Sequence, residues 1–324
     1  MPFTTPGKCR GLQQLSTPRG SLSVLALDQR NNLRQALNPS NPAAVTDAAL
    51  SAFKIEVVAA VAPAASATLL DPEVGAAQCI AAGALPGQRG LMVALEATGY
   101  TGGPTARNSQ ILPGWSVAKS QALGASAVKL LIYYHPGAKT APVIEAFVRD
   151  VAAECAALDL ALCVEPLSYA LDATQKKITG PEVRAVVIET AKRLVVPGVD
   201  VLKAEFPLDS AAEPDERIWA EACAELTDAS AAPWILLSAG VDYETYLRQV
   251  RVACCSGASG VAAGRAVWKE ATALSGSARA AFLATTALER MTRLTTLCDA
   301  LARPWSAYWQ APKVEEGWYH AYGN

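Results

Sequence analysis

The sequence predicts a single (β/α)₈ barrel, the TIM-barrel class of α/β proteins. Short apolar runs recur eight times along the chain, and segments with helix start signals separate them. The repeat is close to one βαβ unit of about 30 residues, and eight such units make a barrel. The alternative is a doubly wound open sheet. It would carry a Gly-rich phosphate loop after its first strand, where this chain has DQRNN.

The predicted strands are near-continuous in Val, Leu, Ile and Ala. That composition is typical of parallel strands buried on both faces. They cover 23–29, 67–72, 91–96, 127–134, 160–166, 201–207, 233–240 and 260–268. No linker or repeat divides the chain, so we expect one domain over 1–324, with an N-terminal capping segment at 1–22 and an aromatic tail at 304–324.

Helix start signals lie between the runs. Asn41 followed by Pro42 predicts a helix N-terminus, because Pro is favoured at the first helical position. Thr179 and Glu182 have the spacing of a capping box. Asp242 is expected to cap the helix that follows the seventh run.

Composition excludes several classes of function. The chain of 324 residues is 51% hydrophobic with a net charge of -2, so disorder is not expected and no basic field exists for nucleic acid. No apolar run reaches the roughly 18 residues of a membrane span. We therefore expect neither a nucleic-acid partner nor a membrane partner. The first residues, MPFTTPGKCRG, lack a signal-peptide core, and we expect a cytoplasmic protein.

Metal chemistry is constrained by the side chains available. The 8 Cys are scattered without a C-x-x-C pair and are expected to be small buried hydrophobes. With only 2 His, a His-rich zinc site cannot be built. A magnesium site made only of carboxylates remains open at this point.

Ionisable residues stand inside or at the ends of most of the predicted strands. Unpaired buried charges are unfavourable, so these groups should converge and pair at the C-terminal rim of the barrel, where such folds build their sites. They are Asp28-Gln29-Arg30, Asp71, Glu96, Lys129, Glu165, Lys203 and Glu205.

A lysine in a buried strand has two interpretations. It forms a structural ion pair, or it is an amine kept partly neutral beside a second ammonium, which can attack a carbonyl. The second interpretation makes Lys203 and Lys129 a Schiff-base pair, with Glu165 as the acid that moves protons. Asp71 and Glu96 can equally be turn caps. Glu205 can be a partner of Lys203 on the same strand face.

The loops after the seventh and eighth predicted strands fit a phosphate group. Such loops of barrels frequently bind phosphate through backbone N–H groups, and here they are built of small residues. Arg265 adds a guanidinium group, which can donate charge-assisted hydrogen bonds to a phosphate. The candidate phosphate-binding residues are Ser238, Gly240, Gly264 and Arg265.

The chain resembles the class I tagatose 1,6-bisphosphate aldolase family. The segments that carry the resemblance are LALDQR, FKIEVV, LLDPEVG, WSVAKSQALGASAVKLLIYY, VLKAEFP and the long stretch at 233–271. The resemblance implies a (β/α)₈ barrel that cleaves a phosphosugar, tagatose 1,6-bisphosphate, to dihydroxyacetone phosphate and glyceraldehyde 3-phosphate. It implies no metal and no cofactor, and it suggests a homo-oligomer.

The resemblance also implies roles. Lys203 in VLKAEFP looks like the Schiff-base lysine, and Glu165 in CVEP looks like the acid/base. Substrate-contacting or orienting groups are implied at Asp28, Gln29 and Lys129, and the phosphate site at Ser238, Gly240, Gly264 and Arg265. No motif assigns the second phosphate, for which Arg30 and Arg107 are the candidates.

Three alternatives remain open. A close relative, sulfofructosephosphate aldolase, shares the lysine and the first phosphate site and accepts a sulfonate at the distal end. A non-catalytic sugar-phosphate-binding regulatory barrel would keep the phosphate loops without needing the Lys203–Glu165 pair. A barrel enzyme of other chemistry, such as an isomerase, would form no Schiff base.

Overall fold

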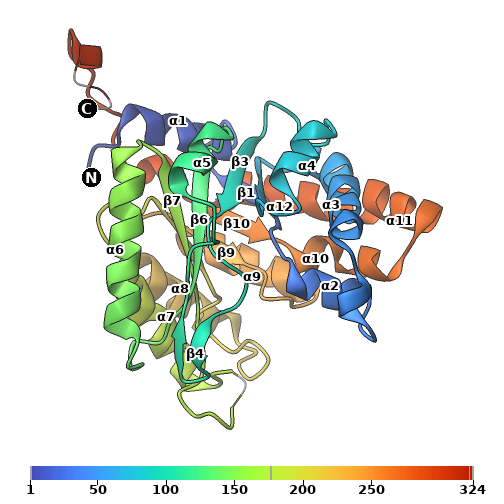
Figure 1. The fold of residues 1–324 in the computed structure, drawn as a ribbon. Helices are drawn as coiled ribbons and strands as arrows, with labels where there is room; N and C mark the ends of the chain where they lie inside the picture. Colours follow the sequence, from blue (N-terminus) through green and yellow to red (C-terminus); the bar gives the residue numbers. More distant parts are fainter. Residues whose placement is uncertain (1, 176, 321, 323–324) are drawn as a thin grey trace.

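The barrel expected from the sequence is present in the computed structural model, which describes residues 2–175, 177–320 and 322. Eight parallel strands close in the order β1-β10-β9-β8-β7-β6-β3-β2, and helices surround them (Figure 1). Neighbours in the barrel are also neighbours in the chain, apart from a separate β4–β5 hairpin inserted between β3 and β6. The fold class predicted from the apolar runs is therefore confirmed.

Each barrel strand falls within or directly beside one of the predicted runs, and nearly all of their residues are buried. The barrel strands are β1 Leu22–Leu27, β2 Ala67–Leu70, β3 Gly90–Ala94, β6 Ala127–Tyr133, β7 Ala161–Leu167, β8 Val201–Ala204, β9 Trp234–Leu237 and β10 Gly260–Ala263. The hairpin strands are β4 Thr101–Gly103 and β5 Ala106–Asn108. The strands are short, so the side chains that follow them lie at the rim of the barrel.

Helices connect the strands on the outside. They are α1 Pro6–Leu15, α2 Asn31–Leu37, α3 Asp47–Val61, α4 Ala76–Ala81, α5 Val117–Ala122, α6 Ala141–Ala157, α7 Pro181–Leu194, α8 Glu216–Ala229, α9 Tyr243–Cys255, α10 Arg265–Trp268, α11 Gly276–Phe282 and α12 Leu288–Leu301. A π-helical turn, Leu283–Ala287, joins the last two. Their buried faces pack against the barrel in three hydrophobic clusters, the largest of which contains Trp219, Trp234 and Trp268.

The expected helix starts have mixed outcomes. Asp242 does cap α9, accepting a hydrogen bond from the Thr245 N–H at 2.9 Å. The helix expected at Asn41 is wrong by several residues, because Pro42 begins only a short 3₁₀ turn and Thr46 caps α3 instead. The capping box at 179–182 is also wrong, since α7 starts after Gly180 without a side-chain cap.

The two ends of the barrel differ. Helix α1 lies across the N-terminal end and contacts β1, β3, β6 and β7, while the β4–β5 hairpin extends beyond the opposite end (Figure 1). The aromatic tail contains a short 3₁₀ turn, Trp318–His320, and projects away from the barrel (Figure 1). Residues 321, 323 and 324 of the predicted tail lie outside the described residues.

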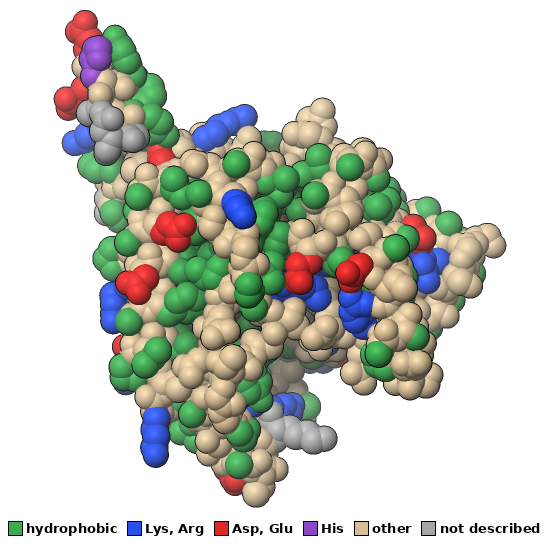
Figure 2. Space-filling model, viewed as in Figure 1, with side chains coloured by type: hydrophobic (Ala, Val, Ile, Leu, Met, Phe, Trp, Pro, Cys, Tyr) green, Lys and Arg blue, Asp and Glu red, His purple; other side chains and the backbone are tan. Residues whose placement is uncertain are grey.

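The surface carries charges of both signs. On the face shown in Figure 2, acidic and basic side chains are scattered among hydrophobic ones, without a large patch of either sign. Within the described part of the chain, no helix has the length and apolar character needed to cross a bilayer.

Candidate active site

A cavity of about 370 Å³ opens at the C-terminal ends of the barrel strands. Its walls come from β1, β3, β6, β7, β8, β9 and β10 and from the residues that follow them. Of the predicted site residues, those that line it are Asp28, Gln29, Glu165, Lys203, Ser238, Gly264 and Arg265. Residues far apart in the sequence meet here because all the parallel strands end at the same rim.

Lys203 and Glu165 form a close pair at the floor of this cavity. Lys203 Nζ lies 2.7 Å from Glu165 Oε1. The register of β7 against β8 pairs Val164 with Leu202, which brings the two next residues side by side. Both side chains are largely buried, with exposed fractions of 4% and 8%. An amine and a carboxylate at this distance can exchange a proton directly.

Lys129 occupies the centre of a group of three carboxylates. Its Nζ is fully buried and lies 2.6 Å from Asp28 Oδ2, 2.6 Å from Glu96 Oε1 and 3.1 Å from Glu165 Oε2. Burial on its own would lower the pKa of Lys129, but the three negative charges raise it well above its ordinary value. Lys129 is therefore a permanent cation beneath the cavity. It does not itself line the cavity.

The carboxylates around Lys129 titrate in opposite directions. Burial opposes ionisation of Asp28, yet the ammonium groups of Lys129 and Lys203 outweigh it and hold the pKa of Asp28 well below its usual range. Burial raises the pKa of Glu96, and Lys129 only partly offsets this. Asp28 is thus a fixed anion, whereas the charge on Glu96 is easier to remove.

Glu96 belongs to the site, although the sequence left it equally open as a turn cap. It follows β3, and its Oε2 accepts a hydrogen bond from the Leu131 N–H at 2.9 Å while its Oε1 faces Lys129. Register pairs Ala94 with Lys129. A carboxylate two residues past a strand, beside a buried lysine on the next strand of the barrel, is the signal that identifies it.

Two buried acceptor atoms in the cavity have no hydrogen-bond partner among the described residues: Glu165 Oε2 and Gln29 Oε1. Lys129 Nζ is near enough to Glu165 Oε2 for an ion pair, but not in a direction suited to a hydrogen bond. Buried polar atoms are usually satisfied, so unpartnered acceptors in a cavity point to a ligand that donates. Hydroxyl groups of a sugar have that chemistry.

The loops after β9 and β10 lie next to each other at the rim of the barrel. The Ser238 hydroxyl accepts a hydrogen bond from the Gly264 N–H at 3.4 Å. Gly240 has φ +81°, and a Cβ added there would lie 3.0 Å from the Arg265 guanidinium carbon. Gly240 does not line the cavity, but its missing side chain leaves the space that the Arg265 guanidinium occupies. The four predicted phosphate residues therefore lie together.

The two candidates for a distal anion are placed differently. Arg30 lines the cavity, and its guanidinium donates to Glu73 Oε2 at 2.5 Å and to the Glu96 carbonyl at 2.9 Å. Arg107, in β5, does not line the cavity. Its guanidinium carbon lies 4.5 Å from the Tyr100 ring centroid and 4.6 Å from that of Tyr169.

Two of the ionisable residues at strand ends are not part of the cavity. Asp71 is paired with Lys54, and both side chains are fully buried. Glu205 lines a separate, narrow gap between the barrel and α7 and accepts a hydrogen bond from the Ser168 N–H at 2.8 Å. The expectation that Glu205 shares a face with Lys203 is wrong, because β8 ends at Ala204 and the alternation of side chains stops there.

The cavity offers little to a metal ion. The carboxylates that gather in the cavity already face the Lys129 ammonium. Among the described residues, no group of three or more His, Cys, Asp or Glu side chains is arranged to hold a metal ion. Seven of the eight Cys are buried and Cys255 is exposed.

Comparison with known proteins decides the family. The model for "DeoC/LacD family aldolase" matches residues 22–270, which include the whole barrel. The chain belongs to this family. Curated relatives agree: a "Tagatose 1,6-diphosphate aldolase" of Listeria monocytogenes is 33% identical over 93% of this chain and 94% of that protein. "Tagatose 1,6-diphosphate aldolase 2" of Enterococcus faecalis is 34% identical over 97% of this chain and 99% of its own length.

Solved structures support the architecture of this DeoC/LacD family member. An archaeal fructose 1,6-bisphosphate aldolase superposes with a TM-score of 0.61 at 21% identity, covering 90% of this chain and 99% of that one. A Schiff-base-forming fructose-1,6-bisphosphate aldolase gives 0.60 at 20% identity, with the same coverage. At these identities the likeness shows the fold.

Proposed function

We propose that the protein is a class I, Schiff-base aldolase that cleaves a ketose 1,6-bisphosphate such as tagatose 1,6-bisphosphate. The products are dihydroxyacetone phosphate and glyceraldehyde 3-phosphate. One observation carries the proposal: Lys203 Nζ lies 2.7 Å from one oxygen of Glu165, while the other oxygen faces the permanent cation Lys129 at 3.1 Å. A nucleophilic amine, a proton carrier and a fixed positive charge thus share one carboxylate.

The first half of the cycle forms the imine. Lys203 first passes its ammonium proton to the Glu165 carboxylate. The neutral Nζ then attacks the C2 carbonyl of the ketose, and Glu165 gives its proton to the former carbonyl oxygen and takes one from the nitrogen. This gives a carbinolamine. A second proton from Glu165 lets that oxygen leave as water, and the Nζ=C2 double bond forms as a protonated imine, which attracts electrons. Lys129 orients Glu165 by its charge, and Asp28 holds Lys129 in place.

The second half breaks the carbon–carbon bond. Glu165, now a carboxylate, takes the proton of the C4 hydroxyl, the C3–C4 bond breaks, and its electron pair moves into the enamine. Glyceraldehyde 3-phosphate leaves. Glu165 then returns the proton to C3, water adds to the imine carbon, and dihydroxyacetone phosphate is released with Lys203 regenerated.

We assign binding of the substrate's C1 phosphate to the loops after β9 and β10, which together form the phosphate cradle. Ser238, Gly240, Gly264 and Arg265 would hold the C1 phosphate through backbone N–H groups and one guanidinium. Gln29 Oε1 would accept a substrate hydroxyl, because it has no other donor among the described residues. The distal anion is assigned to Arg30, which lines the cavity on the side of β1.

A trapping experiment tests the proposal. Dihydroxyacetone phosphate with borohydride should add its mass irreversibly to the peptide that contains Lys203, and Lys203→Met should abolish the adduct. An adduct at Lys129 would overturn the assignment of the nucleophile. The absence of any adduct, together with ligand binding that survives Lys203→Met, would favour the regulatory barrel. Turnover should persist in EDTA.

We also propose that the enzyme acts in the cytoplasm, where phosphorylated sugars are retained by their charge, and that it is a homo-oligomer. Exposed aromatic side chains in the tail, Trp318 and Tyr319, support an interface between copies. Light scattering behind a sizing column tests the oligomer: truncation after Pro304 should lower the measured mass.

A further inference from the structure

A second, larger cavity lies at the opposite end of the barrel from the proposed active site. Its volume is about 720 Å³, and it opens between α1, the starts of β1, β2 and β3, and the C-terminal half of α12. Gly20 and Ser66, which line it just before β1 and β2, are separated from the catalytic rim by the length of the strands. The aldolase chemistry proposed above makes no use of it.

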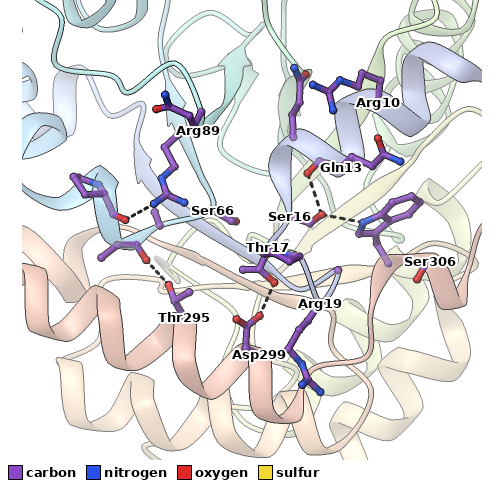
Figure 3. Close-up of a pocket in the computed structure, with 18 residues that line it drawn as sticks. Arg10, Gln13, Ser16, Thr17, Arg19, Ser66, Arg89, Thr295, Asp299 and Ser306 are labelled. Carbon is purple, nitrogen blue, oxygen red and sulfur yellow. Dashed lines mark hydrogen bonds between the residues drawn. The ribbon is translucent and has the colours of Figure 1, made fainter.

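Three arginines line this cavity: Arg10 on α1, Arg19 in the following loop and Arg89 just before β3. Arg10 and Arg89 lie on opposite sides of it, with Arg19 at its lower edge (Figure 3). The side chains of Arg10 and Arg19 have no hydrogen bond or ion pair within the described residues. Arg89 donates to the Pro63 carbonyl at 2.7 Å and is also unpaired with any described carboxylate.

The one acidic residue that lines the cavity is already engaged. Asp299 accepts hydrogen bonds from the hydroxyls of Thr17 and Ser21 rather than from an arginine. Further lining side chains can donate to an anion: Gln13, Gln14, Gln88 and Ser306. Three guanidinium groups and one carboxylate leave the cavity with an excess of two positive charges.

The frame of the cavity is tied together by hydrogen bonds. The Ser66 hydroxyl donates to the Leu15 carbonyl at 2.6 Å, which fixes the end of α1 to the start of β2. The Trp305 Nε1–H donates to the Ser16 hydroxyl at 3.1 Å. The arginines are thus carried by elements with fixed positions, so an anion bound there would meet a site formed in advance.

We propose that this cavity binds a small polyanion, a metabolite that carries at least two phosphate groups. Three guanidinium groups line one cavity without a paired carboxylate, and an anion with several charges can accept charge-assisted hydrogen bonds from more than one of them. The volume exceeds what a single inorganic phosphate fills. The cavity is concave and open to solvent on one side, so a small molecule can enter it.

Pyrophosphate is the probe that tests the site. Pyrophosphate binding is measured by titration calorimetry on the full-length Arg265→Gln variant. In this variant the phosphate cradle at the other end of the barrel is weakened, so pyrophosphate that binds there contributes less to the signal. In this background, Arg10→Gln with Arg19→Gln should weaken pyrophosphate binding at least tenfold. The matched control is Arg149→Gln with Arg293→Gln, which removes two exposed arginines that line neither cavity.

Three further outcomes decide the matter. Pyrophosphate should raise the melting temperature of the control variant and not that of the Arg10/Arg19 variant. The Arg10/Arg19 variant alone should keep its melting temperature and its aldol cleavage rate, since both side chains are exposed and unpaired. Equal loss of affinity in the test and control variants would show a general effect of charge and overturn the proposal. Stoichiometric pyrophosphate binding that Arg265→Gln removes from the wild type, and that the Arg10 and Arg19 substitutions leave unchanged, would overturn it too.

Discussion

Lys203 and Lys129 reach the same carboxylate from two different strands. Lys203 Nζ lies 2.7 Å from Oε1 of Glu165, and Lys129 Nζ lies 3.1 Å from Oε2. The two lysines therefore interact through Glu165 as well as through their charges. A change at either lysine removes a contact of the one carboxylate that would exchange protons with the substrate.

The first prediction concerns Glu165. Glu165→Gln keeps the size of the side chain but removes the atom that accepts and returns protons, so we expect kcat to fall by about 10²- to 10⁴-fold. The control is Glu205→Gln, a buried carboxyl only two residues from Lys203 that faces away from the cavity. Steady-state cleavage assays compare them. A similar loss in both variants would mean that the Glu165 effect is structural.

The second prediction separates stability from activity. Lys129→Met leaves Asp28, Glu96 and Glu165 without their central cation, and breaking a buried ion pair of this kind destabilises by about 3–5 kcal/mol. Lys8→Met is matched to it, because Lys8 forms a buried pair with Asp200 at 2.7 Å at the other end of the barrel. Urea unfolding should show losses in both variants. Only Lys129→Met should reduce turnover per folded molecule, and full turnover there would remove Lys129 from the mechanism.

The barrel was predictable because its strands are buried on both faces. Runs such as 127–134 and 160–166 are near-continuous in apolar residues, and each encloses or overlaps an observed strand, β6 Ala127–Tyr133 and β7 Ala161–Leu167. Polar residues at the ends of such runs have to be at the rim, which is why Asp28, Glu165 and Lys203 could be placed in one site.

The features that could not be predicted depend on where a strand ends and on which tertiary contacts a side chain makes. Glu205 appeared to share a face with Lys203, but β8 ends one residue earlier and the carboxyl turns toward α7. Glu182 was expected to close a capping box, whereas its carboxylate lies 3.4 Å from His135 Nε2. A sequence pattern shows which groups can interact locally, and tertiary contacts decide which of them do.

The third prediction uses the opposite pKa shifts beside Lys129. The pKa of Glu96 is raised by burial, so its contribution to stability is present below its unfolded value of about 4.3 and is lost as pH rises through the folded value. The pKa of Asp28 is lowered in the folded state despite burial, so its contribution is present above about pH 3.9 and is lost on acidification.

Unfolding of Glu96→Gln and Asp28→Asn across pH measures this difference. Relative to Glu96→Gln, the wild type should lose stability as the pH rises above about 4.3. Relative to Asp28→Asn, it should lose stability only below about pH 3.9. A difference between wild type and Glu96→Gln that stays constant from pH 4 to pH 8 would show that Glu96 does not titrate as described.

The fourth prediction concerns Gly240. Gly240→Ala places a side chain at φ +81° and brings its Cβ to 3.0 Å from the Arg265 guanidinium carbon, so the arginine has to move. We expect a loss of about 1–2 kcal/mol in stability and a rise in KM on the order of tenfold, with a smaller effect on kcat. Gly114→Ala is the control, because it also has positive φ (+78°) but has no atom near the added Cβ. If KM rises equally in both, backbone strain rather than Arg265 is responsible.

The fifth prediction concerns which arginine binds the distal anionic group of the substrate. It compares two variants on two kinds of substrate. Arg30 lines the cavity, whereas Arg107 lies over the rings of Tyr100, Tyr133 and Tyr169 and does not itself line it. We therefore expect Arg30→Met to raise KM for ketose 1,6-bisphosphates by about 10- to 100-fold, the loss of one charge-assisted contact, and to leave KM for a ketose 1-phosphate nearly unchanged. Arg107→Met should alter neither.

The assay compares tagatose and fructose 1,6-bisphosphates, sulfofructose 1-phosphate and the two ketose 1-phosphates side by side. An equal loss on all of them would mean that Arg30 acts by holding Glu96, whose carbonyl it contacts at 2.9 Å, and not by binding the distal group.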